Sequence, residues 1–162
     1  MDTTHFISSK VLELSTISDI IFQNKKIELS KEAIEKIEKC RNYLDDKIKH
    51  QDQPIYGINT GFGSLCDVKI SKDKLTQLQE NLVMSHACGV GSEVPKEVVK
   101  LMLLFKIQSL SYGHSGVQLE TVKRLIDFFN NDILPIIYTQ GSLGASGDLA
   151  PLAHLALPLI CL

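Results

Sequence analysis

The stretch GSLGASGDLAPLAH, residues 141–154, decides both the fold and the function predicted for this chain. Three glycines, two serines and an alanine fall within seven residues, and an apolar segment follows them directly. Glycine loses more backbone entropy in a helix than any other residue, so residues 141–147 are not ordinary helix. Such a segment serves a purpose that depends on the main chain: a turn, an anion-binding loop, or chemistry of the main chain itself. A plain glycine-rich turn before a helix is the simplest alternative, with Asp148 as the N-cap.

Three familiar glycine-rich motifs do not fit this stretch. A nucleophile elbow needs G-x-S-x-G, but Ser146 is followed directly by Gly147 and Asp148. A P-loop needs a lysine, which the stretch lacks, and neither 141–147 nor 57–63 matches the dinucleotide fingerprint. A phosphate site at the start of the following helix is disfavoured because the acidic Asp148 opposes anions.

Main-chain chemistry is a rarer possibility that stands beside the plain turn, and the residue types suit it. The unhindered amide nitrogen of Gly147 can attack the carbonyl carbon of Ala145 and close a five-membered ring. Loss of one water from this ring, and of the Ser146 hydroxyl as a second water, leaves an exocyclic methylidene. The product is an electron-poor alkene, and the ordinary side chains offer no electrophile of comparable strength.

Further motifs accompany this stretch in order along the chain. They are YGINTGFG at 56–63, NLVMSHACGVG at 81–91 and LSYGHSGV at 110–117. Together with residues 141–154 they resemble the signature segments of the aromatic amino acid ammonia-lyase family, and the resemblance covers the chain from about Lys10 onward. The resemblance implies that Ala145, Ser146 and Gly147 form the family's 4-methylidene-imidazol-5-one group. No metal and no dissociable cofactor is expected.

The family eliminates ammonia from an amino acid and leaves an α,β-unsaturated acid. The methylidene-imidazolone is implied as the electrophile that acts on the amine, and Tyr56 matches the tyrosine to which the family assigns base catalysis. A free phenol has a pKa of about 10, so Tyr56 needs positive dipoles nearby, such as helix N-termini. Asn59 and Gly63 are expected to shape the tyrosine loop, and Asp148 to cap the helix behind the electrophile.

The pair Ser85-His86 bears on the substrate. It resembles the histidine-specific members, which convert L-histidine to urocanate and ammonia, and His86 is then expected to contact the substrate side chain. Some bacterial tyrosine lyases carry the same pair, so tyrosine or phenylalanine lyases and aminomutases of the family stay open as alternatives. His114 and His154 also lie in shared segments, where core or hydrogen-bonding roles are expected rather than catalysis.

Composition places the chain among globular proteins. It has 162 residues, 44% of them hydrophobic and 22% charged, with a net charge of -2 and no basic patch that would indicate nucleic acid. No signal peptide is recognised, the longest apolar run (149–162) is too short to span a bilayer, and no membrane association is expected. Four scattered cysteines without a CxxC pair indicate reduced thiols and a cytoplasmic location.

Periodicity predicts a mainly α fold with a few short strands near the N-terminus. Short strands are predicted at Lys10–Leu14 and Lys26–Leu29. Helices are predicted after Ser15, Ser30, Ser71 and Pro95, over Thr121–Phe129, and after Asp148. Val98–Leu110 is apolar nearly all round, which predicts burial on every side, in this chain's core or in a bundle shared with other chains.

The sequence ends within an apolar segment at Ile160-Cys161-Leu162. We therefore expect residues 1–162 to be the N-terminal, methylidene-imidazolone-bearing domain of a longer chain with the ammonia-lyase (fumarase/aspartase-like) fold, truncated before its central helical bundle. The resemblance implies a homotetramer for the full-length enzyme and places the carboxylate-binding arginine beyond residue 162. The isolated 162-residue chain is expected to be a catalytically silent fragment.

Overall fold

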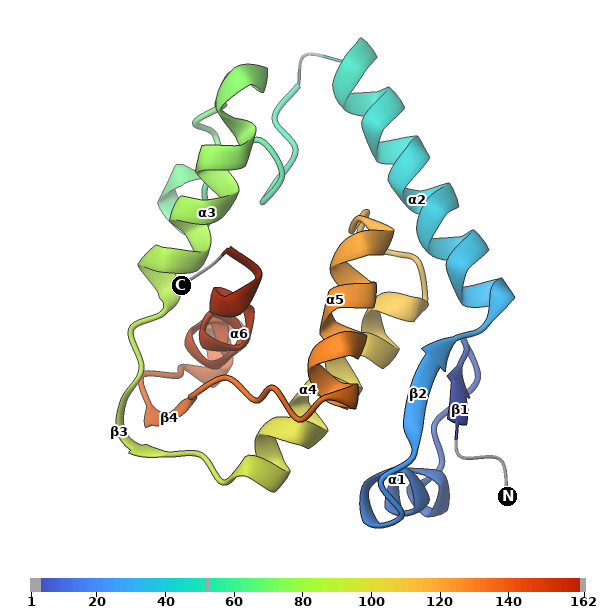
Figure 1. The fold of residues 1–162 in the computed structure, drawn as a ribbon. Coiled ribbons are helices and arrows are strands. Elements are labelled where there is room, and N and C mark those ends of the chain that lie inside the picture. The colour runs from blue at the N-terminus through green and yellow to red at the C-terminus, as the bar shows by residue number, and fades with distance from the viewer. Residues whose placement is uncertain (1–3, 52, 161–162) are drawn as a thin grey trace. The chain divides into compact units, whose positions relative to one another are not determined.

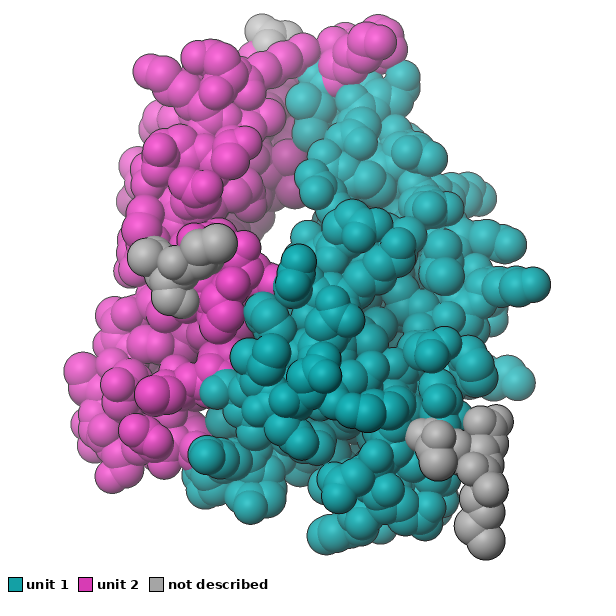
Figure 2. Space-filling model, in the orientation of Figure 1, with its two compact units in different colours: residues 1–48, 95–134 teal, residues 49–94, 135–162 magenta. Residues whose placement is uncertain are grey.

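The computed structural model describes residues 4–51 and 53–160, without the side chain of residue 146. The chain is mainly helical with a few short strands, as predicted (Figure 1). It divides into two compact units, the first made of residues 1–48 and 95–134 and the second of residues 49–94 and 135–162 (Figure 2). Each unit thus combines two segments that are far apart in the sequence.

The first unit contains a two-stranded parallel sheet and a set of helices. Its elements are β1 (Thr4–Ile7), α1 (Leu14–Phe22), β2 (Lys26–Leu29), α2 (Lys31–His50, of which residues 31–48 belong to this unit), α4 (Lys96–Ser111) and α5 (Leu119–Asn130). β1 pairs with β2 from Thr4↔Lys26 to Ile7↔Leu29. A parallel pair needs a crossover, which α1 supplies.

The strand predicted at Lys26–Leu29 is confirmed as β2, whereas the strand predicted at Lys10–Leu14 is wrong. The first strand lies at Thr4–Ile7, and the residues after it form a loop. Hydrogen bonds from α4 explain this loop. Gln108 donates from Nε2 to the carbonyls of Ser8 (2.7 Å) and Lys10 (3.3 Å), so these main-chain acceptors bond a helix side chain instead of a neighbouring strand.

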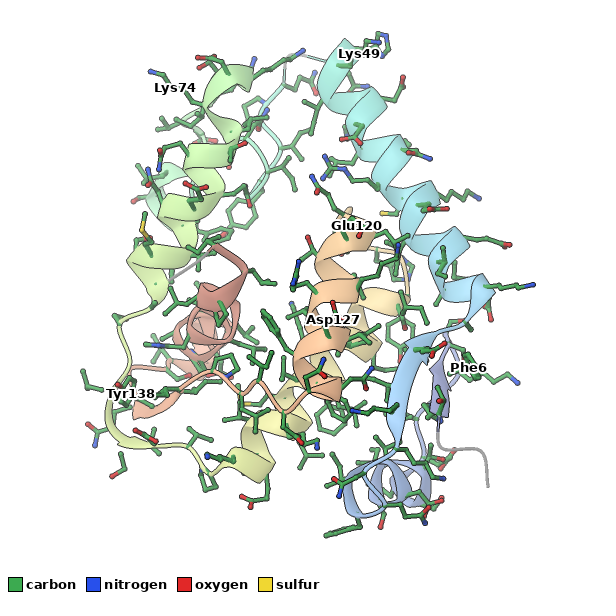
Figure 3. The ribbon with its side chains drawn as sticks, viewed as in Figure 1. Phe6, Lys49, Lys74, Glu120, Asp127 and Tyr138 are labelled. Carbon is green, nitrogen blue, oxygen red and sulfur yellow. The ribbon has the colours of Figure 1, made fainter. Side chains whose placement is uncertain are left out.

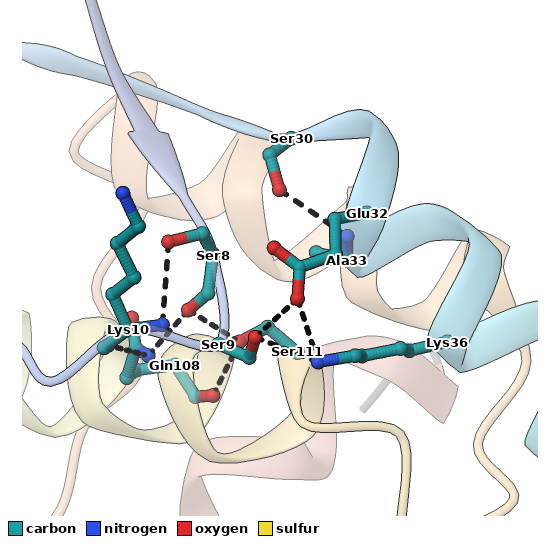
Figure 4. Close-up of polar contacts among 9 residues, drawn as sticks. All are labelled: Ser8, Ser9, Lys10, Ser30, Glu32, Ala33, Lys36, Gln108 and Ser111. Carbon is teal, nitrogen blue, oxygen red and sulfur yellow. Dashed lines mark hydrogen bonds and ion pairs between the residues drawn. The ribbon is translucent and has the colours of Figure 1, made fainter.

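A cluster of polar contacts fixes the same loop against two helices (Figure 4). Ser111 Oγ on α4 donates to the Gln108 carbonyl at 2.6 Å, and Gln108 is itself buried. Ser9 Oγ donates to Glu32 Oε1 at 2.5 Å, and Lys36 Nζ lies 2.6 Å from the same oxygen. These hydrogen bonds hold the pKa of the Glu32 carboxyl below its ordinary value. Buried polar groups are thus paired, as a stable core requires.

The free edge of β2 is closed by one amide side chain. Asn130, at the end of α5, accepts from the Ile27 N–H and donates to the Ile27 carbonyl, both at 2.9 Å. A single asparagine therefore replaces a neighbouring strand, and it fixes α5 against the sheet. Asp127 and Glu120, on the exposed side of the same helix, are labelled in Figure 3.

Helix starts agree with the sequence patterns to within a few residues. Ser30 caps α2 as predicted, since its Oγ accepts from the Ala33 N–H at 3.2 Å. α1 and α5 begin slightly earlier than predicted, at Leu14 and Leu119. Pro95 stands directly before α4.

α4 is not buried on every side within this chain. Its core face includes Leu103, Leu104 and Ile107, which are fully buried. Val98 and Phe105 are 44% and 48% exposed, so the predicted burial all round by the chain's own core is wrong. Burial of these two side chains by other chains stays a prediction.

The second unit joins a helix pair to a short antiparallel sheet. Its elements are the 3-10 helices η1 (Gly63–Leu65) and η2 (Lys72–Lys74), α3 (Leu75–His86), β3 (Val90–Glu93), β4 (Tyr138–Gln140), η3 (Gly144–Ser146), α6 (Leu149–Ala156) and η4 (Leu157–Ile160). α3 packs on α6, and β3 pairs with β4 through an irregular register. The sequence analysis did not predict this second sheet. No helix within residues 4–51 and 53–160 has both the length and the apolar character needed to cross a membrane.

Candidate active site

The tyrosine loop is a tight turn braced from inside by one asparagine. Tyr56 lies in the turn in which the Ile58 and Asn59 N–H groups bond to the Ile55 carbonyl, at 3.0 and 3.2 Å. The Asn59 side chain is 6% exposed; it accepts from the Ile55 N–H at 2.6 Å and donates to the Gln53 carbonyl at 3.2 Å. The Tyr56 side chain is 63% exposed. Asn59 therefore shapes the loop, as predicted, and leaves the phenol accessible.

A glutamine that the sequence analysis missed connects this loop to α3. Gln79 Nε2 donates to the carbonyls of Gly57 and Ile58, at 3.1 and 3.0 Å. Nothing in the pattern of α3 distinguishes Gln79 from its polar neighbours, because its role depends on two carbonyls that are some twenty residues away. The loop is thus tied to the helix that carries His86.

Phe62 brings Tyr56 and His86 together. Its ring centroid lies 5.5 Å from that of Tyr56 and 5.4 Å from that of His86, the latter edge to face. A Cβ at Gly57, whose φ is +68°, would lie 2.8 Å from Phe62 Cε1, so the glycine is needed for this ring to pack. Phe62 was not singled out from the sequence, although it lies inside the YGINTGFG motif.

The phenol of Tyr56 has one main-chain donor near its oxygen. The Gly63 N–H, at the start of η1, points to Tyr56 Oη at 3.5 Å, the long limit of a hydrogen bond. Gly63 takes a φ of +57°, and a Cβ there would meet no atom within 4 Å. η1 is only three residues long, so the predicted roles of Gly63 in the loop and of a helix N-terminus beside the phenol stay predictions.

His86 is the last residue of α3, and its ring is held in one orientation. Nδ1 lies 2.7 Å from the Leu82 carbonyl and 3.2 Å from Ser85 Oγ. A carbonyl only accepts, so Nδ1 carries the hydrogen, and in the neutral ring Nε2 keeps its lone pair. His86 thus offers a hydrogen-bond acceptor at Nε2.

The predicted ring-forming segment is a single tight turn after β4. Gly144–Ser146 form η3, and the Gly147 N–H donates to the Gly144 carbonyl at 3.1 Å. Gly147 and Asp148 both take left-handed conformations, with φ of +85° and +56°. Such a conformation costs a residue with a side chain of order 1–3 kcal/mol, so the turn at Asp148 is strained.

Asp148 precedes α6 as predicted, but its side chain does not cap the helix. An N-cap residue needs an extended backbone, and the left-handed conformation of Asp148 excludes the usual bond to the first turn. Its Oδ1 accepts instead from Ser142 Oγ. The predicted capping role is therefore wrong, and Asp148 closes the turn around residues 143–147.

The predicted cyclisation of Ala145–Gly147 stays a prediction. A Cβ at Gly144 or at Gly147 would meet no atom within 4 Å, so the turn stands in open space. The Gly147 N–H bonds to the Gly144 carbonyl rather than to that of Ala145. Among the described residues no cluster of three or more His, Cys, Asp or Glu is placed to hold a metal ion. Cys40, Cys66 and Cys88 are free thiols, and Cys161 lies outside the described residues.

Solved structures of lyases and aminomutases share this fold. Ergothionase from Treponema denticola superposes with a TM-score of 0.91 at 30% identity, over 97% of this chain and 31% of its own. Tyrosine aminomutase from Streptomyces globisporus gives a TM-score of 0.87 at 33% identity, over 96% of this chain and 29% of its own. The fold is thus the one found in about 30% of an ammonia-lyase or aminomutase chain.

The sequence gives the family directly, because residues 12–162 match the family described as aromatic amino acid lyase. The chain belongs to this family, and the resemblance recognised in its motifs is confirmed. Histidine ammonia-lyase of Deinococcus radiodurans is 49% identical over 154 residues, which cover 95% of this chain and 29% of that protein. The enzyme of Staphylococcus saprophyticus is 49% identical over 91% of this chain and 30% of its own length. The chain therefore spans about 30% of these curated relatives.

Proposed function

We propose that this chain is the N-terminal part of a histidine ammonia-lyase, which converts L-histidine to urocanate and ammonia. The observation that carries the proposal is the fixed ring of His86, with Nδ1 bonded to the Leu82 carbonyl and Nε2 left as an acceptor. The imidazole of a histidine substrate has an N–H that such an acceptor binds. The curated relatives cited above, at 49% identity, support the same substrate.

Ala145, Ser146 and Gly147 are the residues that would form the methylidene-imidazolone. The Gly147 nitrogen attacks the Ala145 carbonyl carbon, one water leaves from the ring, and the Ser146 hydroxyl leaves as the second water. Alanine and glycine present the least bulk to closure, and the open space around Gly144 and Gly147 agrees with this. When formed, the group supplies the electrophile that turns the substrate amine into a leaving group.

Tyr56 is proposed to take the β-proton of the substrate at its Oη. The exposed side chain is accessible to a substrate, and its oxygen has the Gly63 N–H as a neighbouring donor. Phe62 contacts both the ring of Tyr56 and the ring of His86, and so links the proposed base to the residue proposed to recognise the substrate side chain.

The oligomeric state, the location and the binding of the substrate carboxylate are proposed from the family and not from residues of this chain. We propose a cytoplasmic homotetramer in which residues outside this chain bind the substrate carboxylate. We also propose that the isolated 162-residue chain is catalytically silent, since it spans only about 30% of its relatives.

A lyase or aminomutase acting on another amino acid is the second candidate. It is favoured by the structural match to tyrosine aminomutase, and the match to an ergothioneine-degrading enzyme adds ergothioneine as a possible substrate. Phenylalanine has no side-chain donor for His86 Nε2, whereas the phenol O–H of tyrosine can donate to it. The preference for histidine over tyrosine therefore rests on the identity to the curated histidine ammonia-lyases.

A substrate panel on the full-length parent enzyme tests the proposal. Wild type and His86→Leu are assayed with L-histidine, L-tyrosine, L-phenylalanine and ergothioneine, after intact mass has shown both to be dehydrated. Loss of the acceptor should lower kcat/KM for L-histidine by about a hundredfold. His114→Gln, an exposed histidine outside the site, serves as the control and should behave as wild type. A wild-type enzyme that prefers tyrosine would contradict the substrate assignment.

A further inference from the structure

His154 is a buried histidine outside the groups assigned to the reaction, and its contacts lie on the segment that follows His86. It belongs to α6, is 8% exposed, and its Nε2 lies 2.9 Å from the Gly89 nitrogen. The ring of Tyr138, labelled on β4 in Figure 3, packs against it edge to face at 5.4 Å. His154 therefore joins α6 and β4 to the start of β3.

The direction of this hydrogen bond fixes the state of the ring. The Gly89 N–H can only donate, so Nε2 of His154 must carry its lone pair, and the hydrogen of the neutral ring lies on Nδ1. Removing this acceptor leaves a main-chain N–H without its partner in a half-buried position. Such a loss costs more than a surface hydrogen bond.

The main chain at Gly89 is held between two contacts. A Cβ at Gly89 would lie 2.9 Å from His154 Nε2 and 3.3 Å from Tyr138 Cβ, so no larger residue fits there. On another side, a Cβ built on Gly141 would lie 3.0 Å from Gly89 Cα and 3.1 Å from the Cys88 carbonyl oxygen. Residues 88–89 are thus packed closely against His154 and against Gly141.

Gly141 and His154 lie on either side, in the sequence, of the segment that is proposed to cyclise. Gly141 precedes Ala145–Gly147, and His154 follows it on the helix that begins at Leu149. Residues 88–89 are separated from His86 only by Ala87, and the Cys88 N–H bonds back to the His86 carbonyl at 2.9 Å. These contacts therefore connect His86, proposed to contact the substrate side chain, with Ala145–Gly147, proposed to act on the substrate amine.

We propose that His154 is a positioning residue for this reaction: as a neutral acceptor for the Gly89 N–H, it sets the distance between His86 and the Ala145–Gly147 turn. The inference rests on the proposed function, and it concerns binding of the substrate rather than formation of the electrophile. Removal of the acceptor should therefore raise KM and leave dehydration of the Ala-Ser-Gly segment intact.

His154→Phe in the full-length enzyme removes the acceptor and keeps an aromatic ring against Tyr138. We expect KM for L-histidine to rise about tenfold, with kcat changed less than about threefold. Hydrogen exchange at the Gly89 amide, read from peptides that span residues 87–92, should become at least about tenfold faster. His154→Gln, whose Oε1 can accept the same N–H, should restore much of both properties, and Tyr138→Phe, which keeps the ring contact, should match wild type.

A second pair of variants tests the contact from the other side. Gly89→Ala should raise KM in the wild-type background, because its methyl group meets His154 Nε2. In a His154→Ala background the same methyl group has room, so the added effect of Gly89→Ala should be several-fold smaller.

Unchanged Gly89 exchange, or unchanged KM, in His154→Phe would overturn the inference. The inference would also be overturned if His154→Phe and His154→Gln raised KM equally and lowered kcat and dehydration equally. That result would indicate a merely structural side chain. If the wild-type enzyme prefers another amino acid, KM is measured for that substrate. The histidine assignment then fails, while the positioning role is still judged by KM and by amide exchange.

Discussion

The Asn59 side chain forms two hydrogen bonds with main-chain groups in the turn that contains Tyr56. Replacement by alanine leaves the Ile55 N–H and the Gln53 carbonyl without this partner. We expect Asn59→Ala to lower the free energy of unfolding by about 1–3 kcal/mol, because unpaired groups in a partly buried turn are costly. Urea denaturation followed by far-UV circular dichroism measures the change.

Asn81→Ala provides the matched control for Asn59→Ala in the same unit. Asn81 is an exposed amide on α3 whose Oδ1 accepts from Gln77 at 2.9 Å. Its loss should change stability by less than about 0.5 kcal/mol. Equal effects of the two substitutions would contradict the bracing role of Asn59.

The residues nearest the proposed chemistry were predictable where a motif contained them. Asn59 bonds two main-chain groups of the tyrosine loop, and the role of Gly63 stays a prediction. The side chain of Asp148 bonds Ser142 instead of capping α6. A motif gives the residue type but not the backbone conformation, and the left-handed φ of Asp148 decides where its carboxylate goes. Gln79 gave no local signal, because its partners lie in another segment.

His5, on β1, gives the first unit a specific pH dependence. Burial, and then the positive charge of Lys25, lower its pKa below the ordinary 6.5. The unfolded chain therefore binds this proton more readily, so the contribution of His5 to stability is complete above the ordinary pKa and is lost as the pH falls through the lowered value. The free energy of unfolding should fall more steeply between about pH 7 and about pH 5 in wild type than in His5→Gln.

Urea titrations of the 162-residue chain over this pH range measure the slope. His114→Gln controls for the loss of one imidazole from an exposed loop. Equal slopes in wild type and His5→Gln would show that the surroundings of His5 do not favour its neutral form.

Helices were easier to predict than strands in this chain. The Ser30 cap and the periodic apolar positions after it suffice to predict α2, because both signals are local. β3 and β4 are short segments nearly fifty residues apart, and β3 is exposed along its length, so it shows no alternation of buried and exposed positions. β1 was missed because the loop after it, held by Gln108, also contains apolar residues.

At the scale of the whole molecule, each compact unit is assembled from two discontinuous segments. Local patterns do not reveal such pairing, and a single domain over residues 1–162 stays a prediction. The residues proposed for the reaction all lie in the second unit: Tyr56, His86 and Ala145–Gly147. The chain spans about 30% of its relatives' length, so the activity is proposed for the full-length protein and not for residues 1–162 alone.

The intact mass of the full-length protein shows whether Ala145, Ser146 and Gly147 condense into the electrophile. We expect a deficit of two waters in every wild-type chain, and no such deficit in Ser146→Ala. A wild-type chain whose mass equals that of its encoded sequence would show that the electrophile does not form.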